Sequence, residues 1–159
     1  MLSSKKKIEF IEKLKKKGLN LYVAESITGG KFTSELVKIK GASKYLDYSI
    51  VTYSNKSKND FLGIEKVIKK HGVVSYEVAA HMAKKISYKS SFKNKISIAC
   101  TGFASKPSTP KDNQQGVVYV AVNYRKKINV VKKIFLKKKR IEVINLTVEE
   151  MFKQGNLII

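Results

Sequence analysis

Ser26 and Lys58 carry side chains of the types that can act as a nucleophile and as a base. Ser26 follows a short apolar run at residues 21–24, and Lys58 follows a segment rich in β-forming residues at 48–53. Hydrolysis of an amide by a serine needs a base for its proton, donors for the oxyanion and an acid for the leaving group. A lysine can be that base where burial lowers its pKa. From the residues alone, Lys58 is either this base or one more solvated surface lysine.

Two junctions between an apolar strand and a glycine offer places for a ligand. The first holds Thr28, Gly29 and Gly30, and the second holds Thr101 and Gly102. Ligands bind at such strand ends in open α/β sheets, because free N–H groups and a helix dipole favour negative charge. Glycine also lets a ligand approach the backbone closely. The same pattern caps helices without any ligand, so both interpretations stay open.

The chain carries a formal net charge of +21, from 33 basic and 12 acidic side chains in 159 residues. Such an excess is typical of proteins that bind nucleic acid or an anionic membrane. Only Arg125 and Arg140 are arginines, however, whereas recognition of bases and phosphates favours the bidentate guanidinium. Because lysines occur in every segment, the charge favours a solvated surface that attracts small anions over a specific nucleic-acid partner.

Neither a metal site nor a membrane anchor is expected from the sequence. Cys100, the only cysteine, lies in an apolar run, and His71 and His81 lack neighbouring ligands at zinc-site spacing. No apolar run approaches the roughly 20 residues that cross a bilayer, and no signal-peptide core follows the N-terminal lysines. We therefore expect a cytoplasmic protein without a metal or cofactor.

Hydrophobic periodicity predicts the helices and strands that position these residues. The first half is expected to hold a helix capped by Ser3 or Ser4 and ended by Gly18, a strand at 21–24, a helix through Phe32 and Val37, a strand at 48–53, a short helix capped by Asn55 and closed by Gly63, and a helix capped by Ser75. The second half is expected to hold a strand at 96–100 broken by Thr101 and Gly102, a loop at 103–115, a hairpin of strands at 116–122 and 128–135, and a helix through residues 144–152.

Strands that alternate with helices and end in a hairpin are typical of the α/β class. We expect a three-layer α/β/α sandwich with a mixed β-sheet. The apolar elements on both sides of the loop at 103–115 need each other to form a core, so residues 1–159 are expected to form a single domain.

An ordered set of short motifs resembles the CinA C-terminal domain family, the nicotinamide-nucleotide amidohydrolases. The motifs cover nearly the whole chain: AESITGG at 24–30, GAS at 41–43, VTYSNKSK at 51–58, LG at 62–63, HGVVS at 71–75, CTG at 100–102 and GVVYVA at 116–121. Each is short, and their order and gaps carry the resemblance.

The resemblance implies hydrolysis of nicotinamide mononucleotide to nicotinate mononucleotide and ammonia by a serine-lysine mechanism without metal. In the family pattern the nucleophile falls on Ser26, the lysine on Lys58, the tyrosine on Tyr53 and the threonine on Thr101. The resemblance also places Arg140 at the substrate, together with Thr28, Gly29, Gly30 and Gly102, and implies a homo-oligomer. From the residues alone, Arg140 could equally be an exposed end of its lysine run.

Three features depart from the family pattern. No glycine lies between Gly102 and Gly116, where the family has a loop rich in glycine and proline. Ile144 stands where the final helix often carries a second arginine. Relatives often carry an N-terminal pyrophosphatase domain, and no such domain or activity is expected here. A nucleotide-binding protein with weakened catalysis is therefore the alternative to an active amidase, and a basic nucleic-acid-associated protein is a third.

Overall fold

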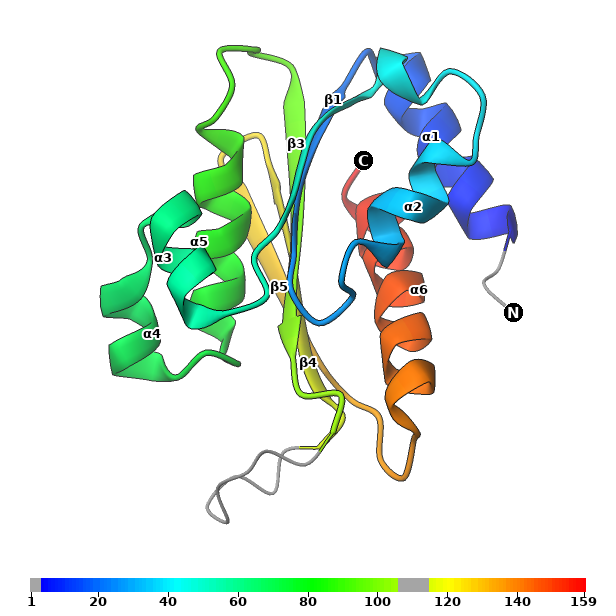
Figure 1. Cartoon of the computed structure of the whole chain (residues 1–159). Helices are drawn as coiled ribbons and strands as arrows, with labels where there is room; N and C mark the ends of the chain where they lie inside the picture. Colours follow the sequence, from blue (N-terminus) through cyan, green and yellow to red (C-terminus); the bar gives the residue numbers. More distant parts are fainter. Residues whose placement is uncertain (1–3, 106–114) are drawn as a thin grey trace.

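The computed structural model describes residues 4–105 and 115–159. Its five strands are Asn20–Glu25 (β1), Leu46–Val51 (β2), Lys95–Gly102 (β3), Val117–Tyr124 (β4) and Lys127–Ile134 (β5). They form one sheet in the order β2-β1-β3-β4-β5 (Figure 1). Strand β1 is parallel to β2 and β3, whereas β4 is antiparallel to both β3 and β5. The carboxyl ends of β1, β2 and β3 therefore meet at one edge of a mixed sheet.

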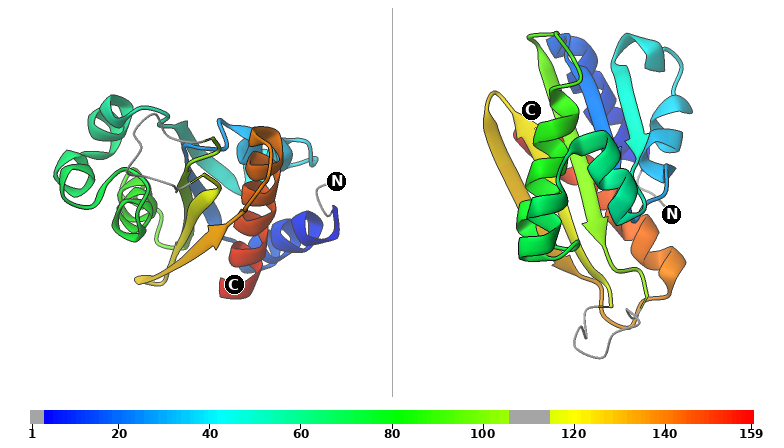
Figure 2. Two further views of the ribbon diagram at one scale, coloured as in Figure 1. Left: turned by 90° about the horizontal axis from the view of Figure 1, so that it is seen from below. Right: turned by 60° about the vertical axis from the view of Figure 1, so that its left-hand side comes forward.

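Helices cover both faces of the sheet, as the three-layer prediction requires. One layer holds Ser4–Lys17 (α1), Lys31–Val37 (α2) and Arg140–Ile158 (α6), and the other holds Asn55–Leu62 (α3), Glu65–His71 (α4) and Tyr76–Ser87 (α5). Figures 1 and 2 show the sheet between these two layers. A 3-10 turn at Ala42–Lys44 precedes β2. The predicted α/β sandwich with a mixed sheet is confirmed.

Strand β1 is central because its side chains enter both cores. Leu21 and Val23 belong to the core under α1, α2 and α6, whereas Tyr22 and Ala24 belong to the core under α3, α4 and α5. Successive side chains of a strand point to opposite faces, so a strand covered on both faces reads as an unbroken apolar run. This rigid strand delivers the chain to Ser26.

Several predicted element ends are confirmed. Gly18 and Gly63 have φ values of 57° and 64° where α1 and α3 end, a conformation that glycine adopts without strain. The Ser75 hydroxyl accepts a hydrogen bond from the Val78 N–H at 3.2 Å, which caps α5. The cap predicted at Ser3 lies outside the described residues, as does most of the loop at 103–115.

Two local predictions were wrong. Thr101 and Gly102 do not break β3; they are its last two residues and pair with Tyr119 and Val118 of β4. The chain therefore returns as an antiparallel strand instead of entering a helix, so this junction lacks the helix N-terminus expected there. The cap of α3 is Ser54 instead of Asn55. Helix α4 was not predicted.

Candidate active site

Ser26 is the first residue after β1 and begins a tight turn. The Gly29 N–H donates to the Ser26 carbonyl at 3.1 Å. Gly29 and Gly30 adopt φ values of 59° and 93°, which an L side chain rarely adopts. A Cβ atom on Gly29 would meet no atom within 4 Å, so a ligand can approach the backbone there. The turn leads directly into α2.

A fully buried carboxylate holds this turn in place. Glu25 accepts hydrogen bonds from the Thr28 hydroxyl at 2.5 Å and from the backbone N–H groups of Gly30 and Phe32 at 3.1 Å each. Thr33 donates to it through its N–H at 2.8 Å and its hydroxyl at 2.6 Å. The carboxylate therefore satisfies free N–H groups at the N-terminus of α2. The sequence interpretation assigned no role to Glu25.

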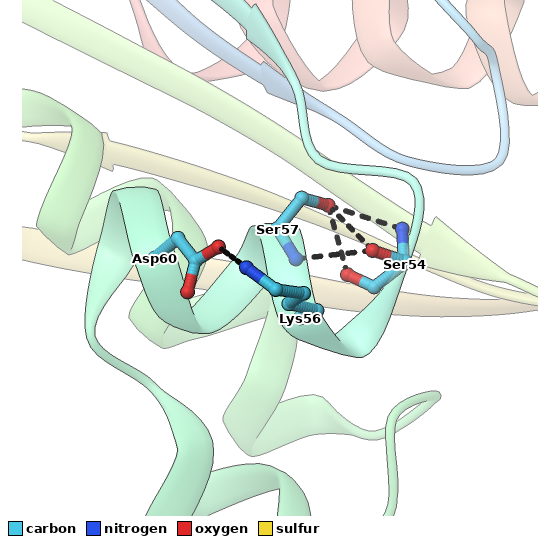
Figure 3. Close-up of polar contacts among 4 residues, drawn as sticks. All are labelled: Ser54, Lys56, Ser57 and Asp60. Atoms are coloured by element: carbon cyan, nitrogen blue, oxygen red, sulfur yellow. Dashed lines mark hydrogen bonds and ion pairs between the residues drawn. The ribbon is translucent and has the colours of Figure 1, made fainter.

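On the other side of the site, α3 begins with a reciprocal cap, drawn in Figure 3. The Ser54 hydroxyl accepts from the Ser57 N–H at 3.0 Å, and the Ser54 N–H donates to the Ser57 hydroxyl at 3.1 Å. Lys56 and Asp60 form an i,i+4 ion pair on the exposed side of the same helix. Such pairs and caps stabilise a short helix. The first turn of α3, which carries Lys58, is fixed as a result.

Lys58 points inward from that first turn and is fully buried. Its Nζ atom lies 2.8 Å from Ser26 Oγ, 2.6 Å from the Thr52 carbonyl oxygen and 3.3 Å from the Tyr53 carbonyl oxygen. Thr52 is itself tied to the end of β1, because its N–H donates to the Glu25 carbonyl at 2.8 Å. The serine and lysine singled out by the sequence are therefore brought into hydrogen-bond contact.

Burial lowers the pKa of Lys58 from 10.5 to about 8, because the charged ammonium loses its hydration. A thiolate at Cys100 would oppose this shift. Burial raises the pKa of the Cys100 thiol to about 11, so it stays neutral at physiological pH and its opposition is absent. Desolvation by burial is the effective cause. Lys58 can thus give up its proton at far lower pH than a surface lysine.

The two residues at the end of β3 make packing contacts around the turn. The Thr101 hydroxyl donates to the Val73 carbonyl oxygen at 2.9 Å. A Cβ atom on Gly102 would lie 2.9 Å from Ile27 Cδ1 and 2.9 Å from the Val117 carbonyl oxygen. Only a glycine lets the Ser26 turn approach β3 this closely. The catalytic role of Thr101 stays a prediction, since its single proton is engaged here.

Tyr53 and Arg140 meet at the surface beside the site. Arg140 donates to the Tyr53 hydroxyl at 2.6 Å and to Ser105 Oγ at 3.4 Å. The Tyr53 side chain is exposed, while its carbonyl oxygen faces Lys58. One residue therefore connects the buried lysine to the exposed arginine at the start of α6. The participation of both residues in catalysis or substrate binding stays a prediction.

The sequence interpretation did not specify what two residues contribute to this arrangement. Glu25 had a usable signal, because a charged residue directly after an apolar run must find buried donors. Thr52 had none, since it acts through its backbone carbonyl. Thr28 contacts Cys100 Sγ at 3.2 Å, which places the cysteine under the turn as part of the core.

Within residues 4–105 and 115–159, no group of three or more histidine, cysteine, aspartate or glutamate side chains could hold a metal ion. No helix in the same part of the chain is long and apolar enough to cross a membrane.

Comparisons with known proteins agree with this fold. A solved structure of a competence-damaged protein (CinA) superfamily protein from Escherichia coli has a TM-score of 0.89 at 24% identity, covering 100% of this chain and 94% of that one. A competence/damage inducible protein, CihA, from Agrobacterium tumefaciens has a TM-score of 0.87 at 28% identity, covering 97% and 92% of the two chains. These likenesses support the shared fold.

Sequence relatives lead to the same group. A CinA-like protein of Prochlorococcus marinus is 35% identical over 152 residues, which are 94% of this chain and 35% of that protein. A competence-damage inducible relative from Finegoldia magna is 40% identical over 120 residues, covering 75% of this chain and 27% of that protein. The chain thus matches about a third or less of the length of these relatives. A family model described as the CinA C-terminal domain matches residues 4–156, and the chain therefore belongs to the CinA C-terminal domain family.

Proposed function

We propose that the protein is an amidase that hydrolyses nicotinamide mononucleotide to nicotinate mononucleotide and ammonia. The observation that carries the proposal is the 2.8 Å contact between Lys58 Nζ and Ser26 Oγ in a site where burial lowers the lysine pKa to about 8. Nucleophile and base within hydrogen-bond reach are the signature of a serine hydrolase site.

The partners of Lys58 suit a neutral amine. A neutral amine has two N–H donors and one lone pair. The carbonyl oxygens of Thr52 and Tyr53 can accept the two N–H groups, at 2.6 and 3.3 Å. The remaining direction leads to Ser26 Oγ, so the lone pair is aimed at the serine proton. A protonated lysine fills the same three contacts with three donors. The site can therefore hold both protonation states without moving.

In the proposed reaction Lys58 takes the proton of Ser26 while Oγ bonds to the carboxamide carbon. The carbonyl electron pair moves to oxygen and gives a tetrahedral intermediate. Its collapse restores the C=O bond and breaks the C–N bond, and the Lys58 ammonium donates its proton to the departing nitrogen, so that ammonia leaves. Water then attacks the acyl ester, Lys58 accepts the water proton and returns it to Ser26, and the acid is released.

On the substrate side, the open backbone at Gly29 allows close approach of the reacting amide. The exposed guanidinium of Arg140 is connected to Lys58 through one residue, Tyr53, and its planar fork suits a phosphate. Thr28, Gly30 and Gly102 then shape the turn instead of contacting substrate, since each is engaged in packing or in binding Glu25. Thr101 can orient the amide once its hydroxyl turns away from Val73.

The proposal is tested by incubating the purified protein with nicotinamide mononucleotide and measuring ammonia. We expect turnover in the wild type and its loss in Ser26→Ala, with Ser34→Ala, an exposed serine on α2, as the matched control. Turnover that survives Ser26→Ala would rule out the nucleophile. Saturable binding of the nucleotide by the wild type without any ammonia release would instead favour the weakened, binding-only alternative.

A further inference from the structure

A cavity of about 600 Å³ lies at the opposite end of the sheet from Ser26. Its lining comes from the end of α5, the start of β3 and the turn between β4 and β5. Because β1 and β3 are parallel, the beginning of β3 and the end of β1 lie at opposite ends of the strands. In Figure 1 the α5–β3 connection and the β4–β5 turn lie at the top, and the turn after β1 lies below. The cavity is therefore separate from the candidate active site.

The cavity lining is strongly positive. It includes five basic side chains and no carboxylate: Lys84, Lys93, Lys95, Arg125 and Lys126. None of the five forms an ion pair with any described residue. The sequence agrees with a lining that lacks carboxylates, since Asp112 is the sole acidic residue between positions 78 and 141. A concave surface of one charge sign concentrates the field and attracts anions of the opposite sign.

Hydrogen bonds of the lining residues hold the wall of the cavity in place. Lys95 Nζ donates to the carbonyl oxygens of Ser87 and Ser90 at 2.7 and 2.9 Å, which binds the end of α5 to β3. Asn123 Nδ2 donates to Ser87 Oγ at 3.2 Å, which binds β4 to the same point. Lys95 is thus used within the protein. Lys84, Lys93, Arg125 and Lys126 are the exposed cations that remain for a ligand.

The β4–β5 turn carries two basic residues at positions where the backbone geometry favours asparagine and glycine. Arg125 and Lys126 have φ values of 50° and 65°, which are left-handed at both central positions of a two-residue hairpin turn. Such turns strongly prefer Asn-Gly, because larger side chains are strained there. The Arg125 guanidinium lies over the Tyr124 ring at 5.1 Å from its centroid. One of only two arginines in the chain is therefore kept at a strained position facing this cavity.

We propose that this cavity binds a phosphorylated small molecule that carries at least two negative phosphate charges. Guanidinium and ammonium groups that have no carboxylate partner are the donors that phosphate oxygens take. The volume is that of a nucleotide-sized ligand site. Tyr88, exposed on the cavity wall, offers an aromatic face to a base. The site is distinct from the proposed amidase centre, and binding there does not depend on amidase activity.

The decisive variant is Arg125→Asn with Lys126→Gly, which installs the preferred turn residues while removing both cations. Isothermal titration with inorganic pyrophosphate and with ADP at about physiological ionic strength, roughly 150 mM salt, measures affinity. We expect a loss of at least about tenfold for both probes. The thermal midpoint of the variant should not fall, since the turn strain is relieved. Retained affinity in this variant would overturn the proposal.

Two further variants separate a built site from general charge. Lys84→Gln with Lys93→Gln removes two cavity cations away from the turn, and we expect it to weaken pyrophosphate binding as well. Lys66→Gln with Lys70→Gln removes the same charge from the exposed side of α4 and should leave affinity unchanged. Equal losses of pyrophosphate affinity in the Lys84/Lys93 and Lys66/Lys70 double variants would contradict the proposal. Unchanged affinity in the Lys84/Lys93 variant would contradict it as well. Tighter binding of ADP than of pyrophosphate, abolished by Tyr88→Ala, would assign the aromatic face to the base.

Discussion

Lysine is buried at one end of the sheet and exposed at the other. At the carboxyl end, Lys58 is the only buried lysine among the described residues, and its pKa is lowered to about 8. At the amino end, Lys84 and Lys93 are exposed and line the cavity. In a chain with 33 basic side chains, burial and not abundance distinguishes Lys58 from the lysines that line the cavity. Each prediction below changes one side of this contrast.

The largest effect is expected from Lys58→Met, which keeps the volume and removes the amine. We expect amidase activity to fall by about 10² to 10⁴-fold, the usual contribution of a positioned acid-base group. Lys93→Met, at the other end of the sheet, should leave activity within about twofold of the wild type. Steady-state ammonia release measures both. Equal activity of the two variants would remove the distinction between the ends.

Comparison of the wild type with Lys58→Met also has a signature in stability. Lys58 has a folded pKa of about 8 and an ordinary value of 10.5, so the unfolded chain binds more protons between these pH values. Stability of the wild type relative to Lys58→Met must therefore rise as pH increases through this window, by up to about 3 kcal/mol. Urea unfolding of both proteins at several pH values tests this. No pH-dependent difference would show that Lys58 is charged and hydrated in the folded state.

The next largest effect is expected from Glu25→Gln. The carboxylate accepts five hydrogen bonds, and the amide would place an NH₂ donor where one of its two acceptor oxygens now lies. We expect the free energy of unfolding to fall by about 2 to 4 kcal/mol. Glu65→Gln, on the exposed face of α4, should change it by less than about 0.5 kcal/mol. Denaturant titration provides the comparison. A small loss in Glu25→Gln would mean that the carboxylate is dispensable for the turn.

A smaller effect is expected when the two site glycines are exchanged for alanine. In Gly102→Ala the new Cβ would lie 2.9 Å from the Val117 carbonyl oxygen and from Ile27, and we expect a loss of about 1 to 3 kcal/mol. In Gly29→Ala the space is open, and only the positive φ costs about 1 kcal/mol. Thermal unfolding ranks the pair. A larger loss of stability in Gly29→Ala than in Gly102→Ala would contradict the close packing of the turn after Ser26 on β3.

The pairing of Ser26 with Lys58 was expected only from the family resemblance, whereas local pattern was enough to predict most strands. It failed where the deciding partner was remote in sequence. A threonine followed by glycine indicates a strand end, yet pairing with Tyr119 and Val118 extends β3 through both residues. Ser54 and Asn55 are both good caps, and only the geometry of the chain selected Ser54. The basic cavity was invisible because its lining comes from separate segments that only the fold brings together.

The most direct test of the buried dyad is the pH dependence of kcat/KM for nicotinamide mononucleotide. A neutral Lys58 is required to accept the Ser26 proton, so activity must rise with pH through the lysine pKa. With that pKa at about 8, the neutral fraction and kcat/KM should increase about tenfold between pH 7 and pH 9 and then level off. A profile that is flat over this range, or one that keeps rising to a midpoint near 10.5, would contradict the account.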